Sequence, residues 1–297
     1  MFEDYYGLRE KPFKKTPDPR YLFLNDAYEE ALEQLLYAVE ERELALLTGE
    51  VGSGKTLLTR ALLDRLPASY QVAMVVNPRL SPSQFLWTVA RELEVPEPAT
   101  RVGELLDQIH GRLLDLDSQG RVALLIVDEA HLIPGRATFE EIRLLTNFQL
   151  DDRNLIAVVL SGQPELRERL LKRRAYRALT QRIGAHFQLR PLTAEDTGAY
   201  LEHRLAVAGA GRLLFTPGAV RRLHAASGGV PRVINHLATQ ALIEGMVRDA
   251  EVVDEEVMAA ACQDQPFVVP RGRSLLRSVR GSLDQGKHLP MTKARSR

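Results

Sequence analysis

Gly49-Glu50-Val51-Gly52-Ser53-Gly54-Lys55-Thr56 is a glycine-rich stretch with the spacing of a phosphate-binding loop. Residues 44–48 before it form a short apolar run typical of a buried strand, and residues 57–66 after it have helical periodicity. A strand that leads through such a turn into a helix directs several backbone N–H groups and the positive end of the helix dipole at one point. The stretch therefore predicts a polyphosphate ligand.

A second motif follows the apolar residues 121–127, which predict another buried strand. A carboxylate at the end of that strand, Asp128, can bind a magnesium ion that bridges the β- and γ-phosphates. The hydroxyl of Thr56 would reach the same ion, and Lys55 would bring its charge to the phosphates. Glu129 could polarise an attacking water as a general base. Together these residues predict a nucleoside triphosphatase.

Ala130 and His131 complete an Asp-Glu-Ala-His sequence. No second sheet domain is evident, which argues against a helicase. We expect His131 either to contact the residues that bind the nucleotide without touching it itself, or to lie in the core.

The order of predicted elements indicates an α/β domain followed by a helical one. Apolar runs at 70–77, 154–161 and 185–189 add strands to those above. Helical patterns occur at 83–93, 102–116 and 139–150, as in a mostly parallel sheet between helical layers. After residue 190 only helical patterns occur. We predict an aromatic and proline-rich arm at 1–25, a nucleotide-binding domain at 26–190, a lid domain at 191–265 and a basic tail at 266–297. The prolines of the arm argue against helix there.

Composition sets further bounds. Lys and Arg total 39, as do Asp and Glu, but the eight basic residues after Pro270 face Asp284 alone, so that tail carries +7 and residues 1–270 carry −7. An acidic body argues against a surface that wraps nucleic acid. Cys262 is the only cysteine, which excludes an intrachain disulfide. Neither a signal peptide nor a run of 18 apolar residues occurs, so we expect a cytoplasmic protein without a transmembrane span.

Several segments resemble the AAA+ ATPases of the general secretion pathway protein A (ExeA) type, which include relatives in pilus biogenesis and in exosortase or exopolysaccharide gene clusters. The resemblance covers about residues 2–265 and lies in the segments Tyr6–Phe13, Thr16–Phe23, Leu47–Gly52, Leu160–Leu166 and Gly228–Asn235. It implies an AAA+ sheet domain followed by a helical lid, with ATP and Mg²⁺ as ligands.

The resemblance also implies roles for three polar residues outside the two motifs. Ser161 matches the sensor that orients the attacking water, with Gln163 as the alternative. Arg232 matches the second sensor, which contacts the γ-phosphate from the lid. Arg182 is the candidate arginine finger that reaches a neighbour's nucleotide in a homo-oligomer. Three arginines nearby, at 173, 174 and 177, remain alternatives.

Two functions follow from this comparison. The favoured one is an ATPase that drives or regulates assembly of an envelope system for secretion, pili or polysaccharide export, with an envelope-assembly or inner-membrane partner. The alternative is a DNA-dependent transposition regulator of the TniB/TnsC type, for which DNA would be the partner. The tail is predicted to be disordered; its spaced apolar residues leave a membrane-surface or partner helix as the alternative, which would place the protein peripherally at the inner membrane.

Overall fold

Strands that are apolar on both faces assemble into one parallel sheet. The computed structural model describes residues 1–14 and 18–263, so the predicted tail at 266–297 lies outside the described residues. The strand order is β2-β3-β4-β1-β5, and each neighbouring pair is parallel. The strands are β1 (Leu44–Gly49), β2 (Tyr70–Val75), β3 (Val122–Val127), β4 (Ile156–Gly162) and β5 (Ile183–Leu189).

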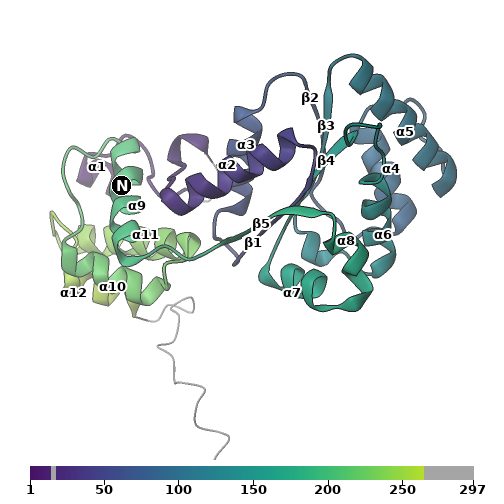
Figure 1. The fold of residues 1–297 in the computed structure, drawn as a ribbon. Helices are drawn as coiled ribbons and strands as arrows, with labels where there is room; N and C mark the ends of the chain where they lie inside the picture. Colours follow the sequence, from purple (N-terminus) through teal and green to yellow (C-terminus); the bar gives the residue numbers. More distant parts are fainter. Residues whose placement is uncertain (15–17, 264–297) are drawn as a thin grey trace, which may run out of the picture.

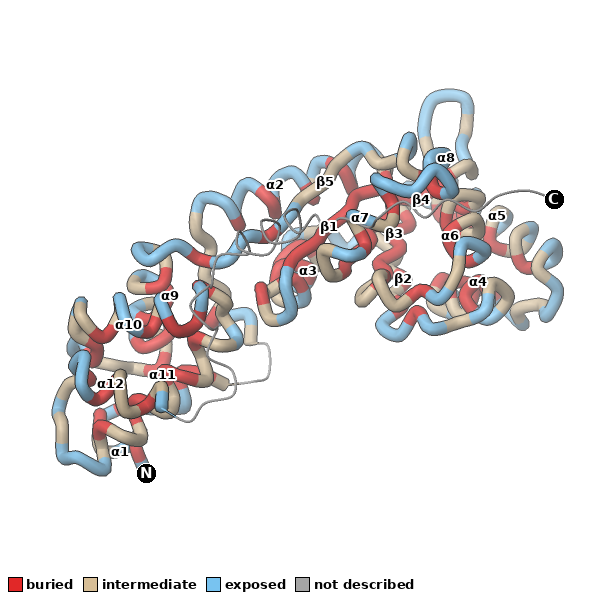
Figure 2. The backbone as a smooth tube through the Cα atoms, turned by 90° about the horizontal axis from the view of Figure 1, so that it is seen from below, coloured by how far each residue is buried: buried red, intermediate tan, exposed pale blue. Residues whose placement is uncertain are grey.

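Helices cover both faces of this sheet because successive side chains of each strand point to opposite sides. In β1, Ala45 and Leu47 join the core beneath α2 (Asp26–Glu40) and α3 (Lys55–Arg65). Leu44 and Leu46 join the core on the other face. That face is covered by α4 (Pro82–Glu92), α5 (Val102–Ser118), α6 (Arg136–Leu145), α7 (Pro164–Lys172) and α8 (Arg177–Thr180). Figure 2 shows the central strands as the buried interior of this domain.

The helical lid forms the second lobe in Figure 1. It consists of α9 (Ala194–Val207), α10 (Pro217–Ser227), α11 (Pro231–Val247) and α12 (Glu255–Cys262). Side chains cap three of these helices at their first turns: Thr193, Thr216 and Asp254 each accept a backbone N–H. The α/β class and the change to helices near residue 190 were both predicted from the sequence.

The N-terminal arm lies on the lid. Tyr6 donates its hydroxyl to the Ala250 carbonyl at 3.1 Å, and the Arg9 N–H donates to the Ala208 carbonyl at 2.8 Å. Arg204 of α9 is only 6% exposed; its Nε donates to the Pro12 carbonyl at 2.8 Å, and its guanidinium lies 4.7 Å from the Tyr21 ring centroid. The arm is therefore structurally part of the lid.

Some predicted details were wrong. The arm contains a short helix, α1 (Phe2–Tyr6), and a 3₁₀ turn, η1 (Pro19–Tyr21), because Phe2–Tyr6 precede the first proline and end at Gly7 with φ 70°. Two further 3₁₀ turns, η2 (Ala130–Leu132) and η3 (Arg174–Tyr176), and the helices α7 and α8 were not predicted. The helix expected to run to residue 150 ends at Leu145, since a turn with a Gln149–Asn154 bridge follows it.

A partly buried ion-pair network ties α5 to the segments that precede β1 and β4. Asp117 contacts Arg42 at 2.7 Å and Arg153 at 2.9 Å, and its side chain is 10% exposed. Hydrogen bonds from the two guanidinium groups lower the pKa of Asp117 to about 2. The network therefore stabilises the folded state only while this carboxylate is charged.

We predict that Asp117→Asn lowers the free energy of unfolding by about 1–2 kcal/mol at pH 7, after allowance for the exposure of Arg153. Because the folded pKa is depressed, this stabilisation is present above the unfolded pKa near 4 and is lost as the pH falls toward 2. Urea unfolding of both proteins between pH 7 and pH 2 would show the difference shrinking. Asp107→Asn, at an exposed position of α5, is the matched control; an equal loss there would contradict the assignment.

Candidate functional site

The glycine-rich stretch forms the turn between β1 and α3. Gly52 and Gly54 have φ of 82° and 97°, a region that L side chains rarely adopt. A Cβ at Gly49 would lie 2.6 Å from the Ser53 hydroxyl. Three glycines are thus needed for the loop to close and present bare backbone N–H groups ahead of α3. Among the other loop residues, Glu50 directly follows β1, Val51 is exposed and Ser53 is buried.

Lys55 is held inside this loop. Its side chain is nearly buried, and its Nζ donates to the carbonyls of Gly49 at 2.8 Å and Glu50 at 3.0 Å. Burial lowers the pKa of the Lys55 ammonium, while the nearby Glu129 and Asp128 act to raise it. A buried cation with only carbonyl partners is electrostatically suited to an anionic phosphate group.

Asp128 lies at the centre of the site because three neighbouring strands end beside it. Its Oδ1 accepts hydrogen bonds from the Ser161 hydroxyl at 2.9 Å and from the Glu129 N–H at 2.9 Å. Its Oδ2 faces the Thr56 hydroxyl at 3.5 Å. Ser161 is the residue before the last of β4 and is fully buried. One carboxylate oxygen is therefore fixed by the protein, and the other is directed toward the phosphate loop.

This arrangement fits a magnesium ion that is carried by a nucleotide. Within residues 1–14 and 18–263, no group of three or more His, Cys, Asp or Glu side chains could hold a metal. Mg²⁺ commonly binds through one or two protein oxygens together with phosphates and waters. The Thr56 hydroxyl and Oδ2 of Asp128, which lie 3.5 Å apart, are placed to supply that protein share. Glu129 stands next to them with a φ of 50° and a side chain that is 41% exposed.

The lid contacts the loop through Arg232. The Arg232 N–H donates to the Gly52 carbonyl at 3.3 Å, and a Cβ at Gly52 would lie 2.4 Å from the Arg232 Cβ. Arg232 itself is exposed at the start of α11. The absence of a side chain at Gly52 therefore allows both the turn of the loop and the close approach of α11.

The arm also reaches the loop, which sequence reasoning missed. Tyr28, at the start of α2, donates its hydroxyl to the Ser53 carbonyl at 2.5 Å. A small pocket of about 40 Å³ lies beside the loop, with room for a few water molecules. Arm residues Leu22 and Phe23 line it together with Leu192, Tyr200 and Pro231 of the lid segment. A larger cavity of about 360 Å³ lies in the lid, away from the loop.

Arg182 lies apart from its own phosphate loop. It precedes Ile183, which pairs with Leu44 at the amino end of β1, whereas the loop follows the carboxyl end. Its Nη1 donates to the Thr146 carbonyl at 3.1 Å. The side chains of three other exposed arginines, at 173, 174 and 177, make no hydrogen bond or ion pair with any described residue. Gln163, the alternative sensor, contacts His131 and not Asp128.

A sheet with this strand order, a phosphate loop after β1, an acidic pair after β3 and a helical lid defines an AAA+ nucleotide-binding protein. A family model described as an AAA domain matches residues 39–170. Solved structures with the same fold include the Aeropyrum pernix ORC2 protein, with a TM-score of 0.62, 16% identity and coverage of 86% of this chain and 71% of that one. The Thermotoga maritima RuvB branch-migration motor aligns with a TM-score of 0.53, 18% identity and coverage of 80% and 68%.

General secretion pathway protein A of Aeromonas hydrophila is 40% identical over 265 residues, which are 88% of this chain and 48% of the relative. The chain belongs to the AAA+ ATPases of the general secretion pathway protein A type. It spans about half the length of that relative. No helix within the described residues is long and apolar enough to span a bilayer.

We predict that Ser161→Ala lowers the rate of ATP hydrolysis about 10-fold or more while nucleotide affinity changes less than about 3-fold, because Asp128 loses the donor that fixes its Oδ1. Phosphate release and calorimetric titration would measure the two quantities. Thr59→Val is the matched control, since the buried Thr59 hydroxyl of α3 has no hydrogen-bond partner in the described structure. Unchanged turnover in Ser161→Ala would remove Ser161 from the sensor role.

Proposed function

We propose that this protein binds ATP together with Mg²⁺, hydrolyses it, and uses the cycle to drive or regulate assembly of an envelope system for secretion, pili or polysaccharide export. The observation that carries the ATPase proposal is the junction at Asp128, where Ser161 of β4 and Thr56 at the start of α3 meet one carboxylate. Family membership and the similarity to a secretion-pathway protein support the assembly role.

In this proposal, different residues bind the phosphates, hold the ion and accept the proton of the attacking water. The loop N–H groups and Lys55 would bind the phosphates, and Thr56 and Asp128 would hold a magnesium ion, whose charge would help to neutralise that of the phosphates. Glu129 takes the proton of the attacking water. Arg232 brings the lid onto the loop when the triphosphate is bound.

Opening and closing of the lid is the step that would transmit this cycle. The pocket beside the loop has room for only a few waters, so entry of a base requires that the lid and arm move away from it. Because the arm is attached to α9 and α11, both would move as one body. A partner that holds the arm or the lid could thus sense the bound nucleotide.

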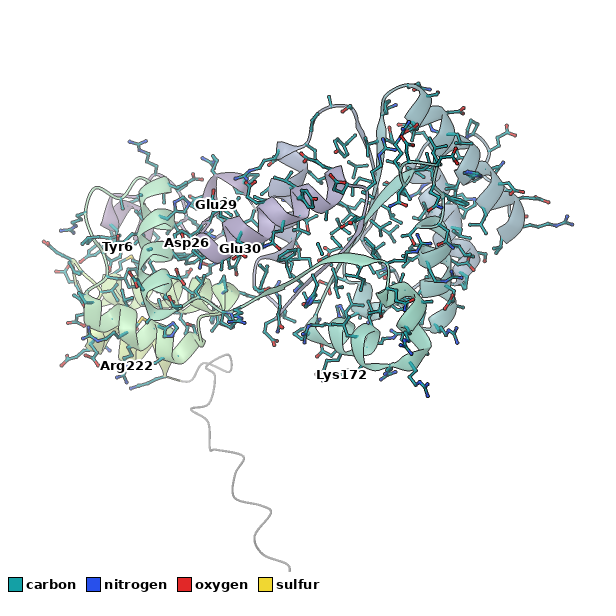
Figure 3. The ribbon with its side chains drawn as sticks, viewed as in Figure 1. Tyr6, Asp26, Glu29, Glu30, Lys172 and Arg222 are labelled. Atoms are coloured by element: carbon teal, nitrogen blue, oxygen red, sulfur yellow. The ribbon has the colours of Figure 1, made fainter. Side chains whose placement is uncertain are left out.

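A homo-oligomer would complete the site in trans. The exposed side chains of the arginines at 173, 174 and 177 have no carboxylate partner among the described residues, and Lys172 of α7, which pairs with Glu168, projects from the same segment in Figure 3. The exposed face of α2 carries Asp26, Glu29 and Glu30, labelled in the same view. Opposite charges on separate parts of one chain favour head-to-tail association of copies. Within the cell we place the protein in the cytoplasm, at the inner membrane where a partner or the basic tail holds it.

We predict that Lys55→Ala weakens Mg-ATP binding at least about 10-fold, whereas Glu129→Gln preserves binding and lowers turnover at least about 100-fold. Calorimetry with a non-hydrolysable analogue and a phosphate-release assay separate the two effects. The absence of any affinity of the wild-type protein for adenine nucleotides would overturn the proposal. Stimulation of turnover by duplex DNA that falls steeply with salt would instead favour a DNA-dependent regulator.

A mixing experiment tests the finger. We expect Arg182→Ala and Glu129→Gln each to be nearly inactive alone, because one lacks the arginine and the other the general base. Mixing them should restore part of the activity, since some interfaces combine an intact base with an intact arginine. If Arg182→Ala alone retains normal turnover, the same mixing test with the arginines at 173, 174 and 177 will identify the finger. Arg136→Ala, on the exposed face of α6, is the control.

A further inference from the structure

The histidine that follows the acidic pair is packed between the general base and the next strand. His131 lies in η2, and its side chain is only 12% exposed. Its Nδ1 is 3.4 Å from Oε2 of Glu129, and its Nε2 is 2.8 Å from Nε2 of Gln163. One imidazole ring thus touches the carboxylate on one side and an amide at the start of α7 on the other.

These contacts bear on which ring nitrogen carries the proton. With the Gln163 side-chain nitrogen facing His131 Nε2 at 2.8 Å, that nitrogen donates and Nε2 accepts. A neutral ring then carries its proton on Nδ1, where it can donate to Glu129. The opposite tautomer would let Nδ1 accept from the Gln163 backbone N–H at 3.4 Å, but it would turn a lone pair toward an anionic oxygen. Electrostatics therefore favours the proton on Nδ1.

Helix α7 fixes the segment that carries His131 at two further points. A Cβ at Gly162 would lie 3.2 Å from the His131 backbone nitrogen and 2.7 Å from Leu166 Cδ2, so the bare glycine allows η2 to approach β4 and α7. Arg169 of α7 donates to the Ile133 carbonyl, just after η2, at 2.5 Å. The same helix leads into the exposed arginines between residues 173 and 182.

We propose that His131 is a positioning residue, which Gln163 holds in the Nδ1–H tautomer so that it orients the Glu129 carboxylate. Contact with another copy at the exposed arginines between residues 173 and 182 would shift α7. Because Gln163 precedes α7 and contacts His131, that shift would change the orientation of the Glu129 carboxylate. This inference deepens the proposed ATPase function and rests on it.

Two amide substitutions separate this role from simple packing. The side-chain nitrogen of Asn can occupy the position of Nδ1, whereas the amide of Gln extends to the position of Nε2. We expect His131→Ala to lower kcat about 10- to 100-fold, with KM and the Kd for a non-hydrolysable ATP analogue within about 2-fold of wild type. His131→Asn should recover most of kcat, and His131→Gln should not.

The link to α7 is tested by a double-mutant cycle. Gln163→Ala should lower kcat by a smaller factor, and Gln163→Ala combined with His131→Ala should be no slower than His131→Ala alone, because both act on Glu129 through the same ring. His110→Asn is the matched control. His110 lies in α5, away from the loop, and its ring stacks on that of Phe148. The kcat of this variant should equal that of wild type.

The outcomes are distinguishable. A wild-type protein without ATPase activity would overturn the proposed function and this inference with it. An active wild type in which His131→Ala retains its kcat, loses nucleotide affinity in parallel, or is rescued equally by Asn and Gln would overturn the role of His131 alone. Additive losses in the double mutant would break the link to Gln163. Thermal unfolding midpoints, together with the unchanged Kd, confirm that each variant is folded.

Discussion

The site depends on the alignment of three parallel strands at one edge of the sheet. Because β3, β4 and β1 are neighbours and run in the same direction, the residues that follow them meet at their carboxyl ends. Asp128 can therefore accept from Ser161 on one oxygen and face Thr56 with the other. A change in strand order would separate these groups even if each strand formed correctly.

The lid, which is formed by a later part of the chain, contacts the phosphate loop at this edge of the sheet. Arg232 packs so closely against Gly52 that a side chain at position 52 would clash with the Arg232 Cβ. The arm is held to the lid by buried Arg204, whose charge is stabilised by the Pro12 carbonyl and by aromatic rings around it. The phosphate loop, the lid and the arm are thus physically connected.

Much of this could be predicted from local patterns. The glycine spacing at 49–56 and the apolar runs before Gly49 and Asp128 indicated the loop, the acidic pair and the parallel sheet, because burial on both faces requires such runs. Helices α7 and α8 escaped prediction because they are short, with nine and four residues, so that few apolar positions repeat within each. The helix in the arm was missed because the prolines that follow it dominated the composition of the segment.

The sequence by itself determined which groups can bind phosphate and magnesium, because bare glycine turns and a strand-terminal carboxylate are local properties. Only the tertiary structure decided which distant residues join them. The contact of Tyr28 with the loop and the placement of the arm on the lid both connect residues that are far apart in the chain. The position of His131 between Glu129 and Gln163 depends likewise on the packing of β4 against η2. Such contacts arise from packing in three dimensions, which no pattern of neighbouring residues encodes.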